Sequence, residues 1–260
     1  MSFDRNYSVA KSFRLDGKHA LITGGGGGIG AGIALALCQA GASVTLVGRT
    51  ESALRDVASE LQSEGHEASI IVCDITDSAA IRSVIDGLPQ LDILVNNAGT
   101  NFPQPIQDVT DENLDLMLNL NVRALFVTSQ AAIKKMLESG DAAEACVINV
   151  TSQMGHVGSP NRSIYCMTKH AIEGLTKALA IELASSGIRV NSIAPTFVDT
   201  PLIRKIVDTP EKYDFLVSKI PLGYMADISD IVGAAVYLAS PAARMVTGTC
   251  IRVDGGWTAQ

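Results

Sequence analysis

Short apolar runs alternate with amphipathic stretches along the whole chain, and this alternation restricts the fold more than any other feature. Seven runs are candidate strands: His19–Thr23, Ser43–Gly48, Ser69–Cys73, Leu91–Asn96, Ala145–Thr151, Arg189–Ile193 and Thr249–Val253. Between them lie stretches with helical periodicity: Ile29–Ala40, Glu51–Glu64, Ser78–Gly87, Glu112–Ser139, Ser163–Ser185 and Ser229–Leu238. Continuous apolar strands that alternate with helices are typical of buried parallel sheets. The pattern therefore predicts an α/β fold, a doubly wound sheet of seven parallel strands with helices on both faces.

The composition is that of a chain with one large core. It has 260 residues, of which 47% are hydrophobic and 18% charged, and no Pro/Ser-rich linker or repeat divides it. We expect a single domain over residues 1–260. The irregular segment 195–227 follows the sixth strand, where ligand-binding loops of such sheets lie, and is predicted to be a substrate lid.

Charge and cysteine content exclude several classes of protein. A net charge of −7 argues against nucleic-acid binding, which needs clustered Lys and Arg. The N-terminus has no signal-peptide pattern, and no stretch is predicted to be long and apolar enough to span a bilayer. The five cysteines are scattered and never form a C-x-x-C pair. We therefore expect a cytoplasmic protein without a metal site.

The first predicted strand runs directly into five consecutive glycines and then a helix. Glycines at such a turn let backbone N–H groups approach a pyrophosphate, and the helix N-terminus favours negative charge. Gly25, Gly27 and Gly30 fit the spacing G-x-G-x-x-G. The alternative spacing G-x-x-x-G-x-G is also present, in which Gly24 and Gly28 precede Gly30. Either spacing predicts a dinucleotide site.

The end of the second predicted strand bears on the choice of cofactor. An NAD site usually has Asp or Glu there, which binds the ribose hydroxyls, whereas this chain has Gly48-Arg49. The planar guanidinium of Arg49 could bind the 2′-phosphate of NADP. Glu51 could instead pair with Arg49. The sequence favours NADP(H), with NAD(H) as the alternative.

Three separated residues form a candidate proton-transfer site. Ser152 follows the fifth predicted strand, and Tyr165 and Lys169 are four residues apart on one helix face. An unperturbed tyrosine, with a pKa of about 10, is a poor base at neutral pH. We expect the ammonium of Lys169 to lower that pKa and Ser152 to hold the substrate oxygen against Tyr165.

Taken together, these motifs resemble the short-chain dehydrogenase/reductase family over almost the whole chain. The matching segments, in order, are Thr23-Gly24-x-x-x-Gly28-Ile29-Gly30, Asp74-Ile75, Asn96-Asn97-Ala98-Gly99, Asn121, Ser152, Tyr165-x-x-x-Lys169 and Pro195 to Thr200. The resemblance implies a Rossmann-like fold and an oxidoreductase that moves a hydride between NADP(H) and a carbonyl/alcohol pair.

The resemblance also implies roles for individual residues. Tyr165 would be the general acid/base, Ser152 the substrate-orienting hydroxyl, and Lys169 the group that binds the nicotinamide ribose and lowers the tyrosine pKa. Asn121 would position a water that links Lys169 to solvent. The implied cofactor-binding residues are Gly24, Gly28, Ile29, Gly30, Arg49, Asp74, Ile75, Asn97, Ala98, Gly99, Tyr165, Lys169, Val198 and Thr200. Gln153, His156 and Thr196 are candidate substrate contacts, and Thr196 replaces the glycine that many members have after the proline.

The substrate is less well defined than the reaction. The stretch Ala194–Val198 is similar to gluconate- and polyol-type members, so a sugar, polyol or sugar acid is the first expectation. A 3-oxoacyl thioester is an alternative within the family, and a non-catalytic dinucleotide sensor is an alternative of another class. A sensor should have lost Tyr165 or Lys169, and both are present. The family resemblance further implies a homotetramer.

Overall fold

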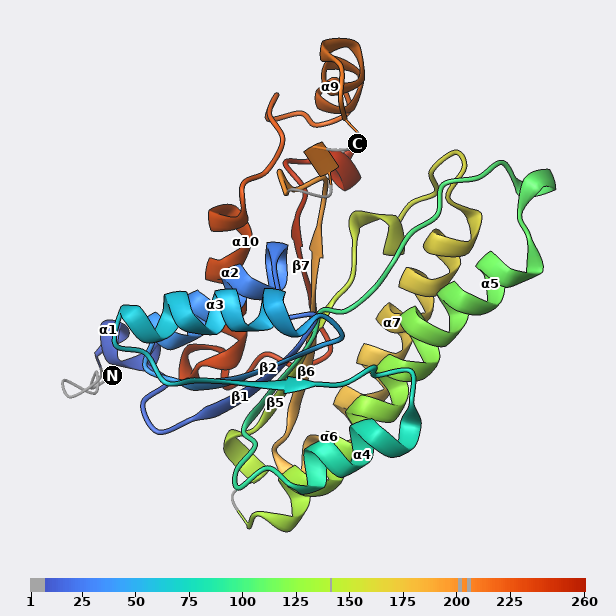
Figure 1. The fold of residues 1–260 in the computed structure, drawn as a ribbon. Helices are drawn as coiled ribbons and strands as arrows, with labels where there is room; N and C mark the ends of the chain where they lie inside the picture. Colours follow the sequence, from blue (N-terminus) through green and yellow to red (C-terminus); the bar gives the residue numbers. More distant parts are fainter. Residues whose placement is uncertain (1–7, 141, 201–202, 205–206) are drawn as a thin grey trace.

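The fold is seen in a computed structural model that describes residues 8–140, 142–200, 203–204 and 207–260 (Figure 1). Seven strands form a single sheet: β1 (His19–Thr23), β2 (Ser43–Gly48), β3 (Ala68–Val72), β4 (Ile93–Asn96), β5 (Cys146–Val150), β6 (Arg189–Pro195) and β7 (Cys250–Val253). Their order is β3-β2-β1-β4-β5-β6-β7, and every neighbouring pair is parallel. The predicted doubly wound, Rossmann-like sheet is confirmed.

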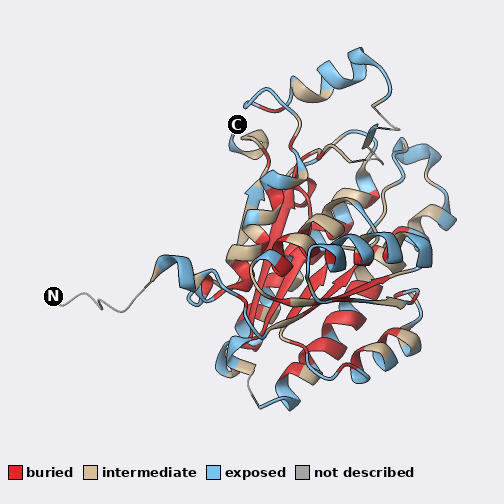
Figure 2. Cartoon of the chain, turned by 60° about the vertical axis from the view of Figure 1, so that its left-hand side comes forward, coloured by how far each residue is buried: buried red, intermediate tan, exposed pale blue. Residues whose placement is uncertain are grey.

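Helices cover both faces of this sheet. The main ones are α2 (Gly28–Gln39), α3 (Glu51–Ser63), α4 (Ser78–Asp86), α5 (Asp111–Leu118), α6 (Leu125–Glu138), α7 (Ser163–Glu182) and α10 (Ile228–Ala239). Two further helices, α1 (Val9–Ser12) and α9 (Pro210–Val217), lie at the periphery. Side chains of α2, α3 and α10 share one buried cluster with the sheet, and side chains of α4, α6 and α7 share a second. The five inner strands β1, β2, β4, β5 and β6 are almost entirely buried between these two layers (Figure 2), which explains their continuous apolar sequences. The edge strands β3 and β7 are partly exposed.

Several helices begin where the chain offers a capping side chain. The carboxylate of Asp77 accepts hydrogen bonds from the N–H groups of Ala79 and Ala80 at the start of α4. Asp227 and Asp230 form a capping box at the start of α10. Such side chains satisfy N–H groups that have no partner within the helix, and so they fix where it begins.

The predicted helix Glu112–Ser139 differs from the observed structure in one respect. Between α5 and α6, residues Asn119–Ala124 form a π-helical segment. A single π-helical turn has no sequence period of its own, so periodicity did not reveal it.

The continuous run Asp111–Glu138 is also long and apolar enough to cross a membrane by length and composition, contrary to the sequence prediction. Half of its apolar window is buried inside the protein. Ala131, Ala132 and Met136 of α6 belong to the second core cluster, so packing against the sheet accounts for their apolar character.

The order of the strands positions the ligand site. The chain moves outward from β1 through β2 to β3, then returns to β4 on the other side of β1. The carboxyl ends of β1 and β4 therefore diverge into loops on opposite faces. This switch point is where doubly wound sheets bind ligands.

Candidate active site

A cavity of about 1130 Å³ lies along the carboxyl ends of the strands. Its wall is made by the turn after β1, the loops after β2 to β6, the start of α7 and one side of α9. It contains nearly all the predicted site residues: Gly24, Gly28, Ile29, Arg49, Asp74, Ile75, Asn97, Ala98, Gly99, Ser152, Gln153, Tyr165, Lys169, Thr196, Val198 and Thr200. Gly30, Asn121 and His156 lie outside this lining.

The glycine turn has the geometry of an anion cradle. Gly24 and Gly28 have positive φ angles of +68° and +53°, which residues other than glycine rarely adopt. A Cβ on Gly30 would lie 2.4 Å from the carbonyl oxygen of Gly24. These constraints favour the spacing G-x-x-x-G-x-G. Gly27 precedes α2 and no side chain caps the helix, so its first N–H groups suit a pyrophosphate.

One end of the cavity presents Arg49 beside Asp74. Arg49 is exposed, and Glu51 pairs with Arg55 instead, with Arg55 Nε 2.9 Å from Glu51 Oε1. Arg49 forms no ion pair within the part of the chain that the structure describes. Its guanidinium is therefore available for a phosphate.

The Asp74 carboxylate accepts hydrogen bonds from the Thr76 amide at 3.0 Å and from the Thr76 hydroxyl at 2.8 Å. The bond from the Thr76 amide has the larger effect and the bond from the Thr76 hydroxyl the next. Both lower the pKa of Asp74, so its carboxyl group is ionised at neutral pH. Since Asp77 caps α4, Asp74 is not required as a helix cap.

The middle of the cavity floor is a hydrogen-bonded joint between β1 and β4. The Asn97 side-chain amide donates to the carbonyl oxygens of Thr23 and Gly24, at 3.1 and 3.2 Å. The Thr23 hydroxyl in turn accepts from the backbone N–H groups of Asn97 and Ala98. The joint fixes the two loops relative to each other, so that Ala98 and Gly99 face the cavity.

Ser152, Tyr165 and Lys169 meet at the other end of the cavity. Ser152 begins the short turn Gln153–Gly155, and its hydroxyl donates to the Gln153 side-chain oxygen at 2.7 Å. Helix α7 carries Tyr165 and, one turn later, Lys169. The Lys169 ammonium lies 5.5 Å from the centre of the Tyr165 ring and donates to the Val150 carbonyl at 3.0 Å. The sequence spacing thus brings a phenol, an ammonium and a hydroxyl together.

Burial controls the proton affinities at this end. It raises the pKa of Tyr165 to about 12, although the neighbouring Ser152 hydroxyl and the Arg162 charge act in the opposite direction. It also lowers the pKa of Lys169 to about 8, against the charge of Glu173. The expectation that Lys169 lowers the tyrosine pKa is therefore not met in the protein alone. Loss of hydration outweighs the nearby charges.

Asn121 contributes from the π-helical segment behind the cavity. Its side chain is buried, accepts from the Thr100 N–H and donates to the Thr100 carbonyl, both at 2.8 Å. A Cβ on Gly99 would lie 3.2 Å from Asn121 Oδ1 and 3.8 Å from Lys169 Nζ. Asn121 therefore lies next to Lys169 and holds the loop after β4. Asn119, two residues earlier on the same segment, has no such contacts among the described residues.

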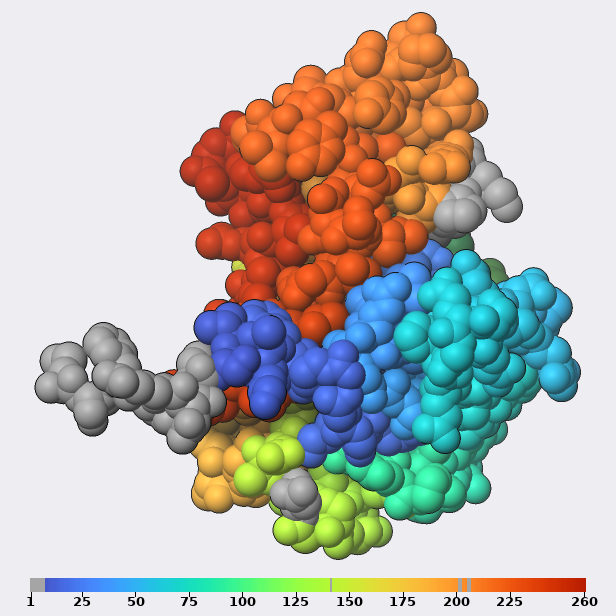
Figure 3. All heavy atoms as spheres, turned by 90° about the vertical axis from the view of Figure 1, so that its left-hand side faces the viewer, coloured from blue at the N-terminus to red at the C-terminus, as the bar shows by residue number. Residues whose placement is uncertain are grey.

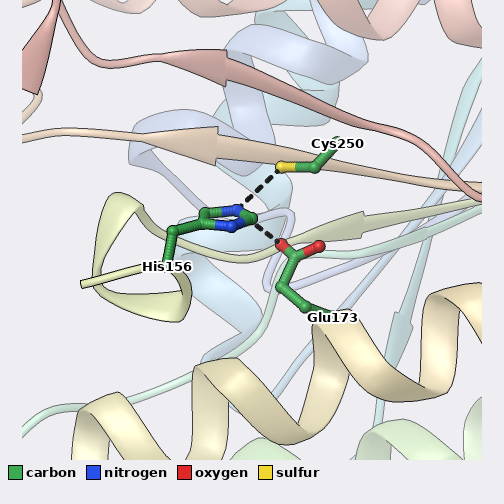
Figure 4. Close-up of side chains that lie close together, drawn as sticks. All are labelled: His156, Glu173 and Cys250. Atoms are coloured by element: carbon green, nitrogen blue, oxygen red, sulfur yellow. Dashed lines mark hydrogen bonds and ion pairs between the residues drawn. The ribbon is translucent and has the colours of Figure 1, made fainter. Parts of the chain in front are cut away.

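His156 is not part of the cavity lining and belongs instead to a separate polar cluster with Glu173 and Cys250 (Figure 4). Its Nε2 lies 3.2 Å from Cys250 Sγ and 3.5 Å from a carboxylate oxygen of Glu173. The same carboxylate accepts hydrogen bonds from the hydroxyls of Thr151 and Ser192, at 2.5 and 2.8 Å. This cluster links the loop after Ser152 to α7, β6 and β7. It fixes the backbone on which Ser152 stands.

Sequence reasoning missed several residues of the lining: Thr100, Asn101, Phe102, Pro103 and Arg162, and the α9 residues Glu211, Lys212, Phe215 and Leu216. Arg162 had one usable signal, since it lies three residues before Tyr165 at the start of the same helix. The α9 residues fall within the predicted lid 195–227, but nothing in the sequence singled them out, because their position depends on how an irregular segment packs.

Known proteins are similar to this chain over nearly its whole length. A family profile described as "Enoyl-(Acyl carrier protein) reductase" matches residues 25–258. L-xylulose reductase of Bos taurus is 37% identical, over 95% of this chain and 98% of that protein. 2-Dehydro-3-deoxy-D-gluconate 5-dehydrogenase of Bacillus subtilis is 38% identical, over 95% of this chain and 96% of its own.

Solved structures agree with these sequence relatives. A gluconate 5-dehydrogenase from Burkholderia cenocepacia, in complex with NADP and tartrate, superposes with a TM-score of 0.92 at 33% identity, covering 97% of this chain and all of the other. A putative gluconate 5-dehydrogenase from Beutenbergia cavernae with bound NADP gives a TM-score of 0.91 at 36% identity, covering 96% of this chain and all of the other.

Proposed function

Because this chain belongs to the short-chain dehydrogenase/reductase family, we propose that it interconverts the keto and hydroxy forms of a sugar, polyol or sugar acid with NADP(H). The observation that carries the proposal is the meeting of Ser152, Tyr165 and Lys169 at one end of a cavity that also holds the glycine turn and Arg49. The relatives named above act, by their names, on sugars or sugar acids. The profile match to an acyl-carrier reductase marks the shared fold, whereas those relatives match over nearly their whole length.

The cofactor fits the cavity in a defined direction. The glycine turn would hold the pyrophosphate, and Arg49 would bind the 2′-phosphate beside Asp74 and Ile75. Val198, Thr200 and Lys169 would then surround the nicotinamide end. Bound NADPH supplies the hydride for reduction.

The protein groups manage the proton. In the reducing direction Ser152 holds the substrate carbonyl, and Tyr165 donates the proton to its oxygen as the carbon is reduced. A phenol whose pKa is about 12 is protonated at neutral pH and is ready to donate. The Lys169 ammonium beside the ring then favours the phenolate that remains, and Asn121 would connect Lys169 to solvent for reprotonation.

Further features complete the proposal. Residues 195–227 act as a lid, because Thr196, Val198, Ile203 and α9, which belong to the described part of this segment, line the cavity; residues 201–202 and 205–206 lie outside the described residues. The chain works as a single domain within a homotetramer, as in the family it resembles. A cytoplasmic location is consistent with five free cysteines.

The decisive experiment is Tyr165→Phe. We expect turnover of NADPH with a ketose or keto acid to fall at least a hundred-fold, since general acid–base catalysis contributes about 10²–10⁴-fold. NADPH affinity, followed by nucleotide fluorescence, should be nearly unchanged because the hydroxyl makes only part of the ribose contact. Full turnover in Tyr165→Phe would refute the mechanism. Turnover of the wild type with NADH but not with NADPH would refute the NADP assignment.

A further inference from the structure

The substrate end of the cavity contains polar atoms that the protein leaves without partners. Within the described residues, three buried side-chain polar atoms have no hydrogen-bond partner: Asn101 Oδ1, Arg162 Nε and Thr196 Oγ1. All three residues line the same cavity as Tyr165. Buried polar atoms without partners cost free energy, so three in one cavity indicate atoms that a ligand satisfies.

Arg162 is the most informative of the three because it is a cation. It is half-buried and forms no ion pair with any residue that the structure describes. The groups that interact electrostatically with it are Tyr165 and Cys166, and neither is a carboxylate. The lining has two carboxylates, but Asp74 is bound to Thr76, and Glu211 is exposed on α9. A half-buried guanidinium without an anion is an incomplete ion pair.

The backbone holds Arg162 firmly in this position. The preceding residue, Asn161, has a φ angle of +59°, and its carbonyl accepts a hydrogen bond from the Gln104 N–H at 3.0 Å. The Gln104 side chain is in turn bound by Asn113 at 2.9 Å. The Arg162 carbonyl accepts from Cys166 in the first turn of α7. Arg162 is thus fixed beside the uncapped start of the helix that carries Tyr165, where negative charge is favoured.

From this arrangement we propose that Arg162, with Thr196 and Asn101, binds the carboxylate and a neighbouring hydroxyl of a sugar acid. Arg162 Nε and the Thr196 hydroxyl donate to carboxylate oxygens, while Asn101 Oδ1 accepts from a substrate hydroxyl. Arg49 lies at the opposite end beside Asp74, so the two cations serve different anions. The proposal rests on the proposed function and selects, among its substrates, keto-aldonates over neutral ketoses.

The test compares substrates that differ only in the carboxylate. 5-Keto-D-gluconate and L-sorbose carry the same keto and hydroxyl groups, with a carboxylate in one and a hydroxymethyl group in the other; further keto-aldonate and ketose pairs with other hydroxyl configurations complete the panel. We expect kcat/KM to favour a keto-aldonate in the wild type, mainly through KM. In Arg162→Gln this preference should fall about ten- to hundred-fold, the value of one or two charge-assisted hydrogen bonds. Because the preference is the ratio of kcat/KM for two substrates of one variant, an effect of Arg162 on Tyr165 that both substrates share cancels. Arg162→Lys should restore part of it.

A binding measurement separates this proposal from the proposed reaction. Calorimetry on the NADP⁺ complex would compare each aldonate with its matched alditol, such as D-gluconate with D-glucitol. Tighter aldonate binding that disappears in Arg162→Gln and persists in Arg244→Gln, an exposed arginine outside the cavity, would support the carboxylate site even without turnover. Turnover without any aldonate preference, or a preference that survives Arg162→Gln, would overturn the site and leave the dehydrogenase intact.

Discussion

Lys169 combines two properties that oppose each other. It is 6% exposed and donates to the Val150 carbonyl, yet burial lowers its pKa from 10.5 to about 8. Between these values the unfolded chain binds more protons than the folded one, so folding becomes more favourable as the pH rises. The cost of burying the charge is present in full below pH 8, and amounts to about 3 kcal/mol.

This cost predicts a pH-dependent difference between the wild type and Lys169→Met without cofactor. Above pH 8 the free energy of unfolding of the wild type should gain on that of the variant by up to about 1.4 kcal/mol per pH unit. Urea unfolding from pH 7 to 9.5 measures this gain. Lys177→Met, on an exposed site of the same helix, should keep a constant offset. A constant offset for Lys169→Met as well would contradict the assigned pKa.

Arg49 supports a prediction about cofactor choice. Because Glu51 is occupied by Arg55, Arg49 is free to bind a phosphate. Arg49→Ala should raise the KM for NADPH about ten- to hundred-fold and leave that for NADH nearly unchanged. Arg244→Ala removes an equal charge at an exposed site outside the cavity and should affect neither. Equal losses for both cofactors in Arg49→Ala would remove it from the 2′-phosphate site.

Residue types and their spacing predicted which side chains lie together at this site better than they predicted the pKa values of those side chains. The four-residue spacing of Tyr165 and Lys169 was sufficient to place an ammonium beside a phenol. Their pKa values depend on hydration in a folded cavity, which spacing does not encode, and there burial outweighed charge. Arg162 was missed for a similar reason, since nothing in the sequence reveals that a cation lacks a partner.

Among the elements, the π-helical segment Asn119–Ala124 has the clearest effect on the site. It directs Asn121 toward the loop after β4, where the side-chain amide of Asn121 binds the backbone N–H and the backbone carbonyl of Thr100. π-helical turns often occur at functional sites because they redirect one side chain within a helix.

This contact predicts that Asn121→Leu loses stability as well as activity. Leucine fits the volume, but the Thr100 N–H and carbonyl lose their partners, which should lower the free energy of unfolding by about 2–4 kcal/mol. Hydrogen exchange should rise at residues 97–101, and NADPH should bind more weakly. Asn119→Leu makes the same change on the same segment and should cost under about 1 kcal/mol in urea unfolding. Similar costs for both variants would show that Asn121 has no special role.

The regular elements were predictable, and the irregular ones were not. β1 and β2 were predicted to the residue, because each short apolar run ends at a glycine, Gly24 directly after β1 and Gly48 as the last residue of β2. β7 was predicted one residue too long and β6 two residues too short, since strand ends depend on hydrogen bonds to neighbours. Helix α9 lies away from the sheet (Figure 1), and the orange segment that contains it forms one end of the molecule (Figure 3). No periodic pattern in the sequence predicted this helix.

At the scale of the whole molecule, apolar side chains remain on the outside of the α6–α7 layer. Phe126 of α6 is 47% exposed, and Ile181 of α7 is 81% exposed. Large exposed apolar residues on one layer are typical of a surface that another subunit covers. They provide a physical basis for the homotetramer that the family resemblance implies, with a mass of about 109 kDa for four chains of 27.3 kDa.

The expected assembly can be tested by placing charge on that layer. Light scattering after size exclusion should give the tetramer for the wild type and a smaller species for Phe126→Asp combined with Ile181→Asp, because two carboxylates would have to be buried in each contact. Circular dichroism should remain native, since both residues are exposed in a single chain. Val9→Asp, at another exposed apolar site, should leave the tetramer intact. A wild-type mass of one chain would refute the tetramer. A tetramer that tolerates the double substitution would show that its contacts lie elsewhere than on α6 and α7.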